Sequence, residues 1–553
     1  MKKLINDIFE ILDIAERRKL WLLTVSDIII SLLDIGFLFL MLLIINFYTR
    51  TTMNAGSGIL SPDLFKEHPL LPITVFFLLF AVKNTFGFIL SGSQYRFVYG
   101  VASRISRDRL LQFLQGNYPD FVHIDSAVMN RKISQQPIEF AHYVLNGMQK
   151  LFSQLVLISI TCLALLLFNP LLFPILILFL APPAILISYI MKRKLNTSLR
   201  NGKTEGEKSI QHLQEALTGY VESNIYLKND FFTWRYYRFQ AQLNRYLSER
   251  LAIQSMPGRL MEVFAVFGLL VLILASNMGG HEPGLRLLTI GSIMIGVYKI
   301  IPGIVQITNL RSQIQTYSYS TVDLSTESSV IPERRNPDFS IDTLQFENIF
   351  FSYADKLILR DFSLEMGKGD FIGISGISGR GKSTMIHLLL GFLTQDSGAI
   401  RINKRFTQSE SRKAYWSRIS YSKQQPFFLH ATLLENITLE EKDQDQEKLE
   451  RVLRITGIDK IIHHFPHGIN TIISENGKNF SGGQRQRFIL ARALYKDADL
   501  IILDEPFSEL DESAEKEMLI QLQSIAAAGK IVLLITHHTE ALHYCNKKLL
   551  MDE

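Results

Sequence analysis

The sequence predicts a bundle of membrane-spanning α-helices followed by an α/β domain with a phosphate-binding loop. Three observations support this fold class. Apolar residues make up 47% of the chain, a high share for a soluble protein, and they are concentrated ahead of residue 315. From Leu344 onward, short β-rich runs alternate with helical segments, as in a parallel sheet with helical crossovers. The third observation is the motif G-x-x-x-x-G-K-[ST], which begins at Gly376.

Length and composition narrow the classes of protein. A chain of 553 residues is too long for a single core, so it predicts more than one domain. Its only cysteines, Cys162 and Cys545, cannot form a disulfide framework or a zinc site. The net charge of +5 is modest and indicates no nucleic-acid partner. We expect no cleavable signal peptide, because residues 1–18 are too polar for one.

Residues 1–18 form the first predicted element. Apolar residues recur there at helical spacing with carboxylates between them, which predicts an amphipathic helix on the membrane surface. Residues 19–314 form the predicted membrane domain, with long intracellular helices. Its apolar stretches are long enough to span a bilayer six times, at residues 20–46, 70–92, 150–168, 170–191, 260–278 and 285–307.

Basic residues give the orientation of these spans. Six spans place both termini on one side of the membrane, and the Lys and Arg residues among the first nineteen place that side in the cytoplasm. Basic residues after the second and fourth spans agree, including Arg104, Arg107 and Lys192. Helical patterns there predict that the spans continue well beyond the bilayer. Residues 315–343, rich in Ser, Thr, Pro and charge, predict a linker to the α/β domain at 344–553.

The phosphate-loop motif has the context that its function requires. Residues 371–375 predict a buried strand before it, and residues 384–390 predict an apolar helix after it. Glycines allow backbone N–H groups to surround a phosphate chain at the amino terminus of that helix. Lys382 would reach the outer phosphates, and Ser383 would ligate Mg²⁺. The predicted ATP-binding residues of this loop are Gly376, Ser378, Gly379, Gly381, Lys382, Ser383 and Thr384.

An apolar strand at residues 498–503 ends in two carboxylates. Its continuous apolar run is typical of a strand buried on both faces. Asp504 would hold Mg²⁺ or its water, and Glu505 would polarise the attacking water. Carboxylates at strand ends also occur as ordinary helix caps. Their position downstream of a phosphate loop favours the catalytic interpretation.

Two further segments carry polar residues suited to phosphate chemistry. Ser481 can cap a helix whose first N–H groups are left bare by Gly482 and Gly483, which predicts a second anion site. A plain helix cap would explain Ser481 but not the Gly-Gly-Gln run that follows. Residues 531–535 predict a buried strand that delivers His537 to its carboxyl end.

With these motifs, the soluble half resembles the nucleotide-binding domain of ABC transporters. The whole chain resembles a bacterial exporter-type half-transporter, which implies the exporter-type ABC fold. The run Ser481, Gly482, Gly483 and Gln484 matches the family signature, which other phosphate-loop proteins lack. The resemblance implies further site residues: Tyr353 stacks on adenine, Gln424 senses Mg²⁺, Glu475 couples to the membrane domain, Asp511 crosses the dimer interface, and His537 is the switch histidine.

The chain departs from the family pattern at several positions. Phe480 replaces the usual Leu before the signature serine, and Lys423 stands where Pro is common. Pro506 and Phe507 follow the catalytic carboxylate, and Ser474 and Asn476 alter the coupling loop. None of these changes removes a predicted phosphate or Mg²⁺ ligand, so they bear on regulation rather than on hydrolysis.

The resemblance also implies a dimer. In the family, each ATP lies between the phosphate loop of one subunit and the signature of the other. The intact Glu505, His537 and signature favour a homodimer, and a heterodimer with a related partner stays open. ATP and Mg²⁺ are the implied cofactors, and membrane lipids and an amphiphilic substrate are the other expected partners.

Charged residues at membrane depth are candidates for a substrate cavity. Such groups face a partner or a water-filled space, so they either brace the helices as salt bridges or line a path for cargo. Both interpretations stay open at the sequence level. The residues are Asp27, Asp34, Lys83, Arg259, Glu262 and Lys299.

We therefore expect ATP-driven export or flipping of a lipid-linked sugar, peptide or drug-like amphiphile across the bacterial inner membrane. Short segments around Arg259 and Lys299 resemble flippases for lipid-linked oligosaccharides, and peptide exporters are an equal comparison. No cysteine-protease domain precedes the first span, so we do not expect a leader-cleaving exporter. The intracellular loops around 120–130 and 219–227 would seat near Gln424 and Glu475. The alternatives are an ABC importer subunit, which the fused domain order disfavours, and an ABC ATPase without transport, which the spans disfavour.

Overall fold

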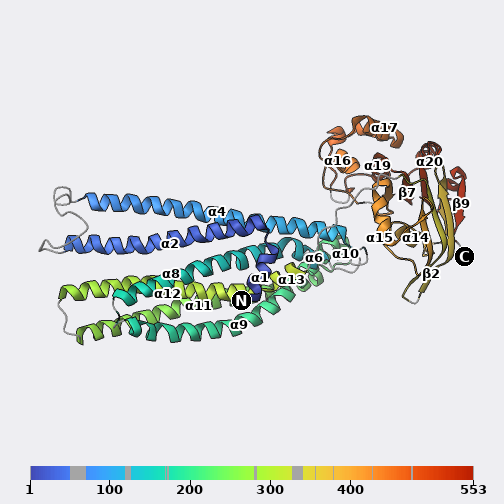
Figure 1. Ribbon diagram of the computed structural model, residues 1–553. Coiled ribbons are helices and arrows are strands. Elements are labelled where there is room, and N and C mark those ends of the chain that lie inside the picture. Colours follow the sequence, from blue (N-terminus) through green and yellow to red (C-terminus); the bar gives the residue numbers. More distant parts are fainter. Residues whose placement is uncertain are drawn as a thin grey trace. The chain divides into compact units, whose positions relative to one another are not determined.

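The computed structural model describes residues 2–49, 70–116, 118, 126–168, 170, 173–278, 283–326, 340–354, 356–377, 379–425, 427–474 and 477–551. Its contacts divide the chain into two compact units. Unit 1 comprises Met1–Gly116 and His123–Ile331, and unit 2 comprises Asn117–Val122 and Pro332–Glu553. Both units are drawn in Figure 1. Each unit is described by itself below.

Unit 1 is helical throughout its described residues. Its helices are α1 (Lys2–Ile11), α2 (Ile14–Thr49), α4 (Leu71–Gln115), α6 (Ser126–Asn130), α7 (Gln136–Glu139), α8 (Asn146–Phe168), α9 (Phe173–Thr218), α10 (Tyr220–Ile225), α11 (Asn229–Met278), α12 (Pro283–Tyr317) and α13 (Tyr319–Thr326). Two π-helical turns, η1 (Arg131–Gln135) and η2 (Phe140–Leu145), flank α7. Each of the six predicted spans overlaps one helix, namely α2, α4, α8, α9, α11 or α12.

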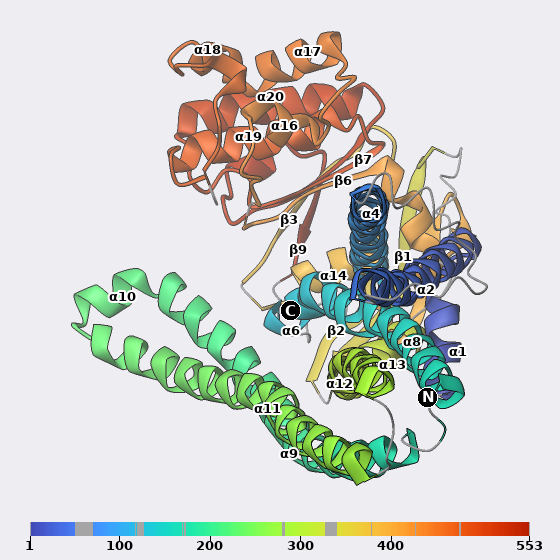
Figure 2. The same cartoon turned by 90° about the vertical axis from the view of Figure 1, so that its left-hand side faces the viewer.

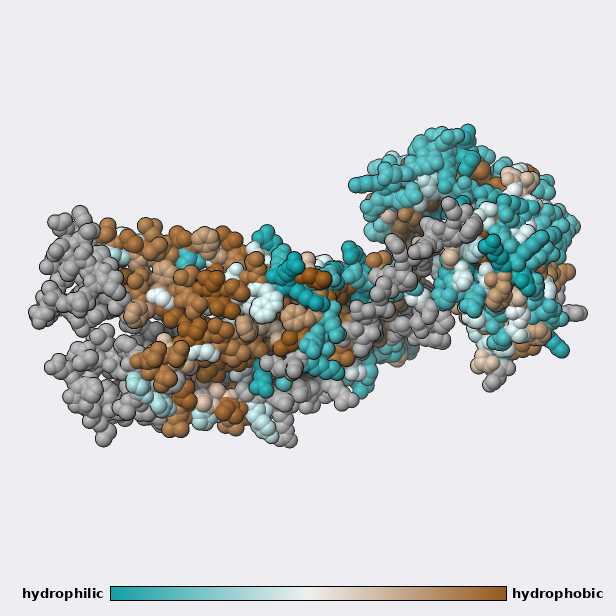
Figure 3. Space-filling model, in the orientation of Figure 1, coloured by the Kyte–Doolittle hydropathy of each residue, from teal (hydrophilic) through white to brown (hydrophobic). Residues whose placement is uncertain are grey.

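Three helical segments in the described residues are long and apolar enough to cross a membrane. They are Ile14–Met41, Leu71–Gln115 and Val128–Leu167. Figure 3 shows hydrophobic side chains gathered on the surface of unit 1, whereas the surface of unit 2 is mainly hydrophilic. The helices α4, α9 and α11 contain 45, 46 and 50 residues, which is longer than the roughly 20 residues that a membrane span requires.

The amino-terminal helix packs on protein as well as being amphipathic. Ile8 and Leu12 are 4% and 1% exposed, in a cluster with Val98 of α4 and Phe140 of η2. Arg104 of α4, predicted as a cytoplasmic charge, binds Glu16 at the start of α2 at 2.8 Å. Part of the apolar face that we assigned to the membrane surface is therefore covered by unit 1 itself.

The helices α9 and α11 pack against each other and carry α10 at their far end. Figure 2 shows this pair running away from α12 toward α10. Gly202 and Gly206 of α9 face Tyr246 and Leu243 of α11, where their lack of a side chain allows close helix approach. The pair therefore presents α10 on an arm of unit 1.

The predicted linker is helical over its first part. The helix α12 continues to Tyr317, and α13 covers Tyr319–Thr326. Stacking of Tyr143 on Tyr317, with ring centroids 4.0 Å apart, holds the end of α12 against η2. The first strand of unit 2 begins at Thr343.

Unit 2 contains two sheets. The antiparallel sheet has the order β2-β1-β4-β5, built from β1 (Thr343–Tyr353), β2 (Lys356–Gly367), β4 (Ser397–Ile402) and β5 (Arg405–Phe406). The second sheet has the order β6-β7-β8-β3-β9, and all of its pairs are parallel. Its strands are β3 (Phe371–Ser375), β6 (Ile419–Ser422), β7 (Leu500–Asp504), β8 (Ile531–Ile535) and β9 (Lys547–Leu550).

Unit 2 also contains the helices α14 (Lys382–Leu389), α15 (Ser409–Arg412), α16 (Leu433–Thr438), α17 (Gln446–Thr456), α18 (Ile458–Ile462), α19 (Gly482–Tyr495) and α20 (Glu512–Ala527). Of these, α19 and α20 contact strands of the parallel sheet. Every residue of β7 and β8 is buried, which explains their uninterrupted apolar sequences. Because these strands are parallel, their carboxyl ends lie at one edge of the sheet, where ligands bind in α/β folds.

Candidate functional site

The phosphate loop joins β3 to α14 at the carboxyl edge of the parallel sheet. Gly381 precedes α14 with φ of 94°, in the left-handed region that favours glycine. A Cβ at Gly381 would also lie 2.8 Å from Leu359 Cδ2, so the loop has no room for a side chain there. Ser378 lies outside the described residues. The strand and the helix that the motif predicted are present on either side of the loop.

Lys382 is turned into the loop. Its Nζ donates hydrogen bonds to the carbonyl oxygens of Gly376 and Ile377, the latter at 3.1 Å, and the residue is 8% exposed. Ser383 and Thr384 follow in the first turn of α14, where N–H groups lack intrahelical acceptors. A phosphate bound at this position would accept hydrogen bonds from the Lys382 ammonium in place of the two carbonyl oxygens. It would also accept hydrogen bonds from the free N–H groups at the start of α14.

Two predicted catalytic residues, Gln424 and His537, contact the third, Glu505. Gln424 Nε2 donates to Glu505 Oε2 at 2.7 Å, and His537 Nε2 lies 2.8 Å from Glu505 Oε1. Glu505 has φ of 50°, an uncommon conformation for a non-glycine residue, which its amide supports by donating to Ile535 O at 2.9 Å. The ends of β6, β7 and β8 therefore bring one amide, one carboxylate and one imidazole together.

Asp504 ends β7 beside this group and is 8% exposed. Burial raises the pKa of its carboxyl and the Glu505 charge adds to the rise, whereas Lys382 opposes it. Tyr421 hydrogen-bonds to Asp504, and burial raises the pKa of this phenol. The sequence analysis missed Tyr421, because an alternating polar and aromatic strand gives no sign of which side chain faces the carboxylate.

These residues fit a magnesium ion. A serine hydroxyl, a carboxylate and an amide oxygen are the hard donors that Mg²⁺ prefers, and Ser383, Asp504 and Gln424 supply one of each. The raised pKa of Asp504 shows a buried carboxylate whose charge lacks full compensation, which a divalent cation would supply.

The signature residues lie in a different pocket. Ser481 caps α19: its Oγ accepts from Gln484 N at 3.3 Å, and Gln484 Oε1 accepts from Ser481 N at 2.9 Å. Asp511 caps α20 beside it. The pocket of about 640 Å³ is lined by residues of both caps and of the segment 457–461, and by no residue of the phosphate loop. One described chain therefore carries both halves of the predicted ATP site but does not join them.

The predicted adenine-stacking residue, Tyr353, lies at an exposed strand end. Tyr353 ends β1 and is 47% exposed, with its ring 4.9 Å from Phe351 in an edge contact. Glu475 lies outside the described residues. Tyr118 belongs to unit 2 and stacks on Phe392 with centroids 4.6 Å apart, beside His387. This stack was not predicted, although its segment adjoins the predicted intracellular loop at 120–130.

Two of the substituted positions of the family pattern, Phe480 and Phe507, are part of the core, whereas Lys423 is exposed. Phe480 is 8% exposed and makes edge contacts with Phe465 and Phe488. Phe507 is 2% exposed in the same cluster. These phenyl groups pack under the signature helix, so the departures at these positions alter packing rather than phosphate contacts.

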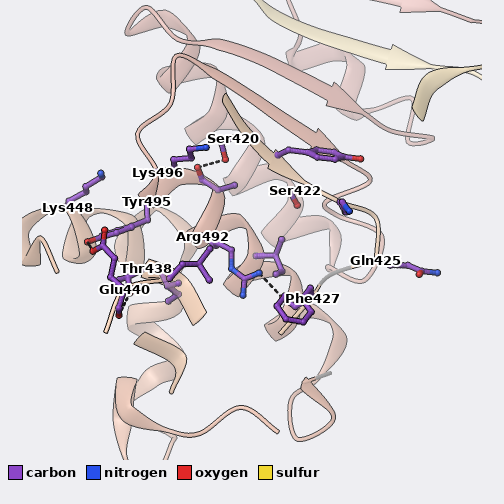
Figure 4. Close-up of a pocket in the computed structure, with 16 residues that line it drawn as sticks. Ser420, Ser422, Gln425, Phe427, Thr438, Glu440, Lys448, Arg492, Tyr495 and Lys496 are labelled. Atoms are coloured by element: carbon purple, nitrogen blue, oxygen red, sulfur yellow. Dashed lines mark hydrogen bonds between the residues drawn. The ribbon is translucent and has the colours of Figure 1, made fainter. Parts of the chain in front are cut away.

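A second pocket, of about 500 Å³, flanks the catalytic group (Figure 4). Its lining combines apolar and cationic side chains, with Phe427 and Leu439 64% and 58% exposed. Arg492 donates to the carbonyl oxygens of Phe427 and Asn436 at 2.7 and 2.6 Å, and burial lowers the pKa of its guanidinium to about 10. The other charged residues of the lining are Lys423, Glu440, Lys448 and Lys496.

The membrane charges separate into a paired and an exposed set. Lys83 of α4 forms an ion pair with Asp34 of α2 and is 8% exposed. Arg259 and Glu262 are exposed on α11, and Asp27 is half-buried on α2. Lys299 belongs to α12, but its side chain lies outside the described residues. The structure thus joins Asp34 to Lys83 across two helices.

Comparison with known proteins agrees with this architecture. The ABC transporter family matches residues 359–508. The chain is 36% identical over 218 residues to an export ATP-binding/permease protein of Rickettsia bellii, covering 38% of this chain and 37% of the relative. It is 30% identical over 276 residues to the lactococcin-G-processing and transport ATP-binding protein of Lactococcus lactis, covering 48% and 38%.

A longer match covers part of the helical unit. The ATP-dependent lipid A-core flippase of Chromohalobacter salexigens is 27% identical over 389 residues, 67% of this chain and 64% of the flippase. The chain spans less than half the length of the first two relatives. A solved bacterial Atm1-family ABC exporter with ATP bound superposes with a TM-score of 0.78 over 98% of this chain and 94% of that one, at 16% identity. Residues 359–508 thus match the ABC transporter family, and the chain as a whole shares the fold of the solved exporter.

Proposed function

We propose that two copies of this chain form an ATP-driven exporter or flippase for an amphiphilic substrate in the bacterial inner membrane. The observation that carries the proposal is the convergence of Gln424 and His537 on Glu505. A carboxylate held between an amide and an imidazole at the carboxyl end of β7 is suited to orient and polarise a water. The same chain carries helices that are long and apolar enough to cross a membrane, so ATP hydrolysis would drive a process in the membrane.

The chemical step uses residues from both pockets. The phosphate loop and Lys382 would bind the nucleotide phosphates, and Mg²⁺ held by Ser383, Asp504 and Gln424 would neutralise charge on them. Glu505 would accept the proton of the attacking water while His537 orients the carboxylate. Because the signature pocket contains no phosphate-loop residue, the second copy would supply Ser481–Gln484 and Asp511.

Coupling to the membrane unit would use the arm that carries α10. Its tip exposes Tyr220, Ile225, Tyr226 and Leu227, each at least 70% exposed, with the carboxylate of Glu222 among them. The pocket of Figure 4 offers exposed Phe427 and Leu439 beside four cationic side chains. We assign α10 of one copy to this pocket of its partner, because apolar area and charge are complementary.

Two classes of amphiphile are candidate substrates. Relatives are named as a lipid A-core flippase and as a lactococcin-G transporter, so amphiphiles of lipid and peptide type are both candidates. Purified protein in proteoliposomes would be tested for ATPase stimulation by lipid-linked sugars, peptides and drug-like amphiphiles. Transport of the stimulating compound is expected with Mg-ATP and not with ATP and a chelator. Stimulated hydrolysis without movement of any compound would contradict an exporter and favour an ATPase without transport.

The docking assignment has its own test. Ile225→Asp places a charge in the apolar tip, so substrate-stimulated transport should fall while ATP binding persists. Asn229→Asp adds the same charge outside the apolar cluster and should retain transport. Equal transport by both variants and the unmodified protein would exclude α10 as the coupling contact.

A further inference from the structure

The loop before α20 carries a carboxylate that the proposed chemistry does not use. Glu509 Oε2 lies 1.4 Å from the position that a Cβ on Gly482 would occupy. Gly482 is the first residue of α19, and its φ is outside the left-handed region. The Glu509 carboxylate therefore fills the space that a side chain at position 482 would occupy.

Hydrogen bonds hold the loop of Glu509 against α19. Gln486 Oε1 accepts from Glu509 N at 2.9 Å, and Gln486 Nε2 donates to Ser508 Oγ at 2.7 Å. Arg485 Nη2 lies 3.3 Å from Glu509 Oε2. The backbone of the loop is thus fixed by Gln486, and within the described part of the chain the ion pair with Arg485 restrains the carboxylate itself.

The ion pair between Arg485 and Glu509 is weak because both side chains are partly exposed to water. The two side chains are 30% and 51% exposed, and pairs of this kind contribute little because water screens them. The Glu509 side chain can therefore leave the start of α19 by rotation while the loop stays bound through Gln486.

The start of α19 is where a carboxylate and a phosphate would compete. The first amides of this 14-residue helix have no intrahelical acceptors, and the helix dipole makes this end positive. Under the proposed function, the nucleotide bound by one copy approaches Ser481–Gln484 of the other. The Glu509 carboxylate, while it lies next to Gly482, would repel the phosphates of that nucleotide until the Glu509 side chain moves aside.

We propose that Glu509 is an internal counter-anion of the signature helix, which occupies its amino terminus in the open state and must be displaced for the dimer to close on ATP. The proposal rests on the proposed function, because it requires ATP to bind between two copies. Its consequence is regulatory: Glu509 raises the ATP concentration at which the two sites close.

The test compares full-length dimers in the Glu505→Gln background, which we expect to bind ATP and to hydrolyse it very slowly. Glu509→Gln keeps the shape of the side chain and removes its charge, and Glu512→Gln removes an exposed charge three residues away. The measurement is the ATP concentration for half-maximal retention of labelled ATP. Glu509→Gln should lower it about two- to fivefold, the scale of a charge at a helix terminus, and Glu512→Gln should leave it unchanged.

Ionic strength separates an electrostatic role from a structural one. The shift caused by Glu509→Gln should disappear near 1 M salt, where the screening length is about 3 Å. An unchanged ATP requirement in Glu509→Gln, or the same shift in Glu512→Gln, would overturn the proposal. A shift that persists at high salt would also overturn it, since that indicates altered loop packing. If the Glu505→Gln parent retains no ATP at all, the proposed function fails instead.

Discussion

His537 Nε2 lies 2.8 Å from Glu505 Oε1, and the two residues come from the ends of neighbouring strands β8 and β7. Gln424 reaches the other oxygen of the same carboxylate from the end of β6. Gln424 and Glu505 are 81 positions apart in the sequence, and the parallel order β6-β7-β8 is what brings the three side chains together. This arrangement gives the first prediction.

Glu505→Gln should leave Mg-ATP binding intact and lower hydrolysis at least about a hundredfold, the scale for losing a positioned acid/base group. Lys382→Ala should instead weaken ATP binding, because its ammonium is the charge inside the phosphate loop. Nucleotide binding and phosphate release would be measured separately on purified protein. Hydrolysis by the Gln variant at the parent rate would show that another group activates the water.

The separation of the signature pocket from the phosphate loop predicts a dimeric enzyme. ATP hydrolysis should rise cooperatively with ATP concentration, and the detergent-solubilised protein should have the mass of a dimer by light scattering. Mixing Lys382→Ala protein with the parent should reduce activity more than dilution does, because mixed dimers contain a damaged site. A monomer with full activity would refute this assembly.

The pairing of Asp34 with Lys83 predicts a structural role for these two residues. Asp34→Asn should lower thermal stability by leaving the buried ammonium of Lys83 without its carboxylate, a loss of a few kcal/mol for a buried pair. The double variant Asp34→Asn with Lys83→Met should recover much of that stability. A double variant no more stable than Asp34→Asn would show that the two charges act independently.

Arg259 and Glu262, which are exposed on α11, are predicted to line a water-accessible path for cargo, with bracing of helices as the alternative. Arg259→Ala should retain basal ATPase and thermal stability and lose stimulation by the substrate. Cysteines placed at both positions should react with a water-soluble thiol reagent in the inward-open state. Protection of both cysteines with and without ATP would exclude the path and leave helix packing as their role.

His387 predicts a pH dependence of unit 2. Burial, together with Lys423, lowers the pKa of His387 below its usual value of about 6.5. The unfolded chain therefore binds this proton first as pH falls, so stability is lost as pH decreases from about 6.5 through the lower folded pKa. His387→Gln should reduce the fall in Tm between neutral and mildly acidic pH. Substitution of the exposed His543 by Gln should leave the fall in Tm unchanged. An equal reduction of the fall in both variants would exclude His387 as the cause.

The sequence by itself determined the order and type of the elements. Spacing and hydropathy predicted a helix at each of the six spans, because a bilayer sets the length of an apolar segment. The phosphate loop, the strand of Asp504 and the cap of Ser481 were also predicted, because each depends on neighbours in sequence. Their chemistry follows from local backbone geometry, which short motifs encode.

Tertiary structure alone decided which side chains meet. The sequence left open whether Asp34 and Lys83 brace helices or line a cavity. The packing of α2 on α4 pairs the two residues, and hydropathy does not show which helices are neighbours. The contact of Tyr421 with Asp504 depends on the order of the strands in the sheet. The position of the Glu509 carboxylate next to Gly482 depends on how the loop before α20 packs against α19. Such contacts join residues that are distant in sequence, and they are fixed by packing in three dimensions rather than by any local pattern.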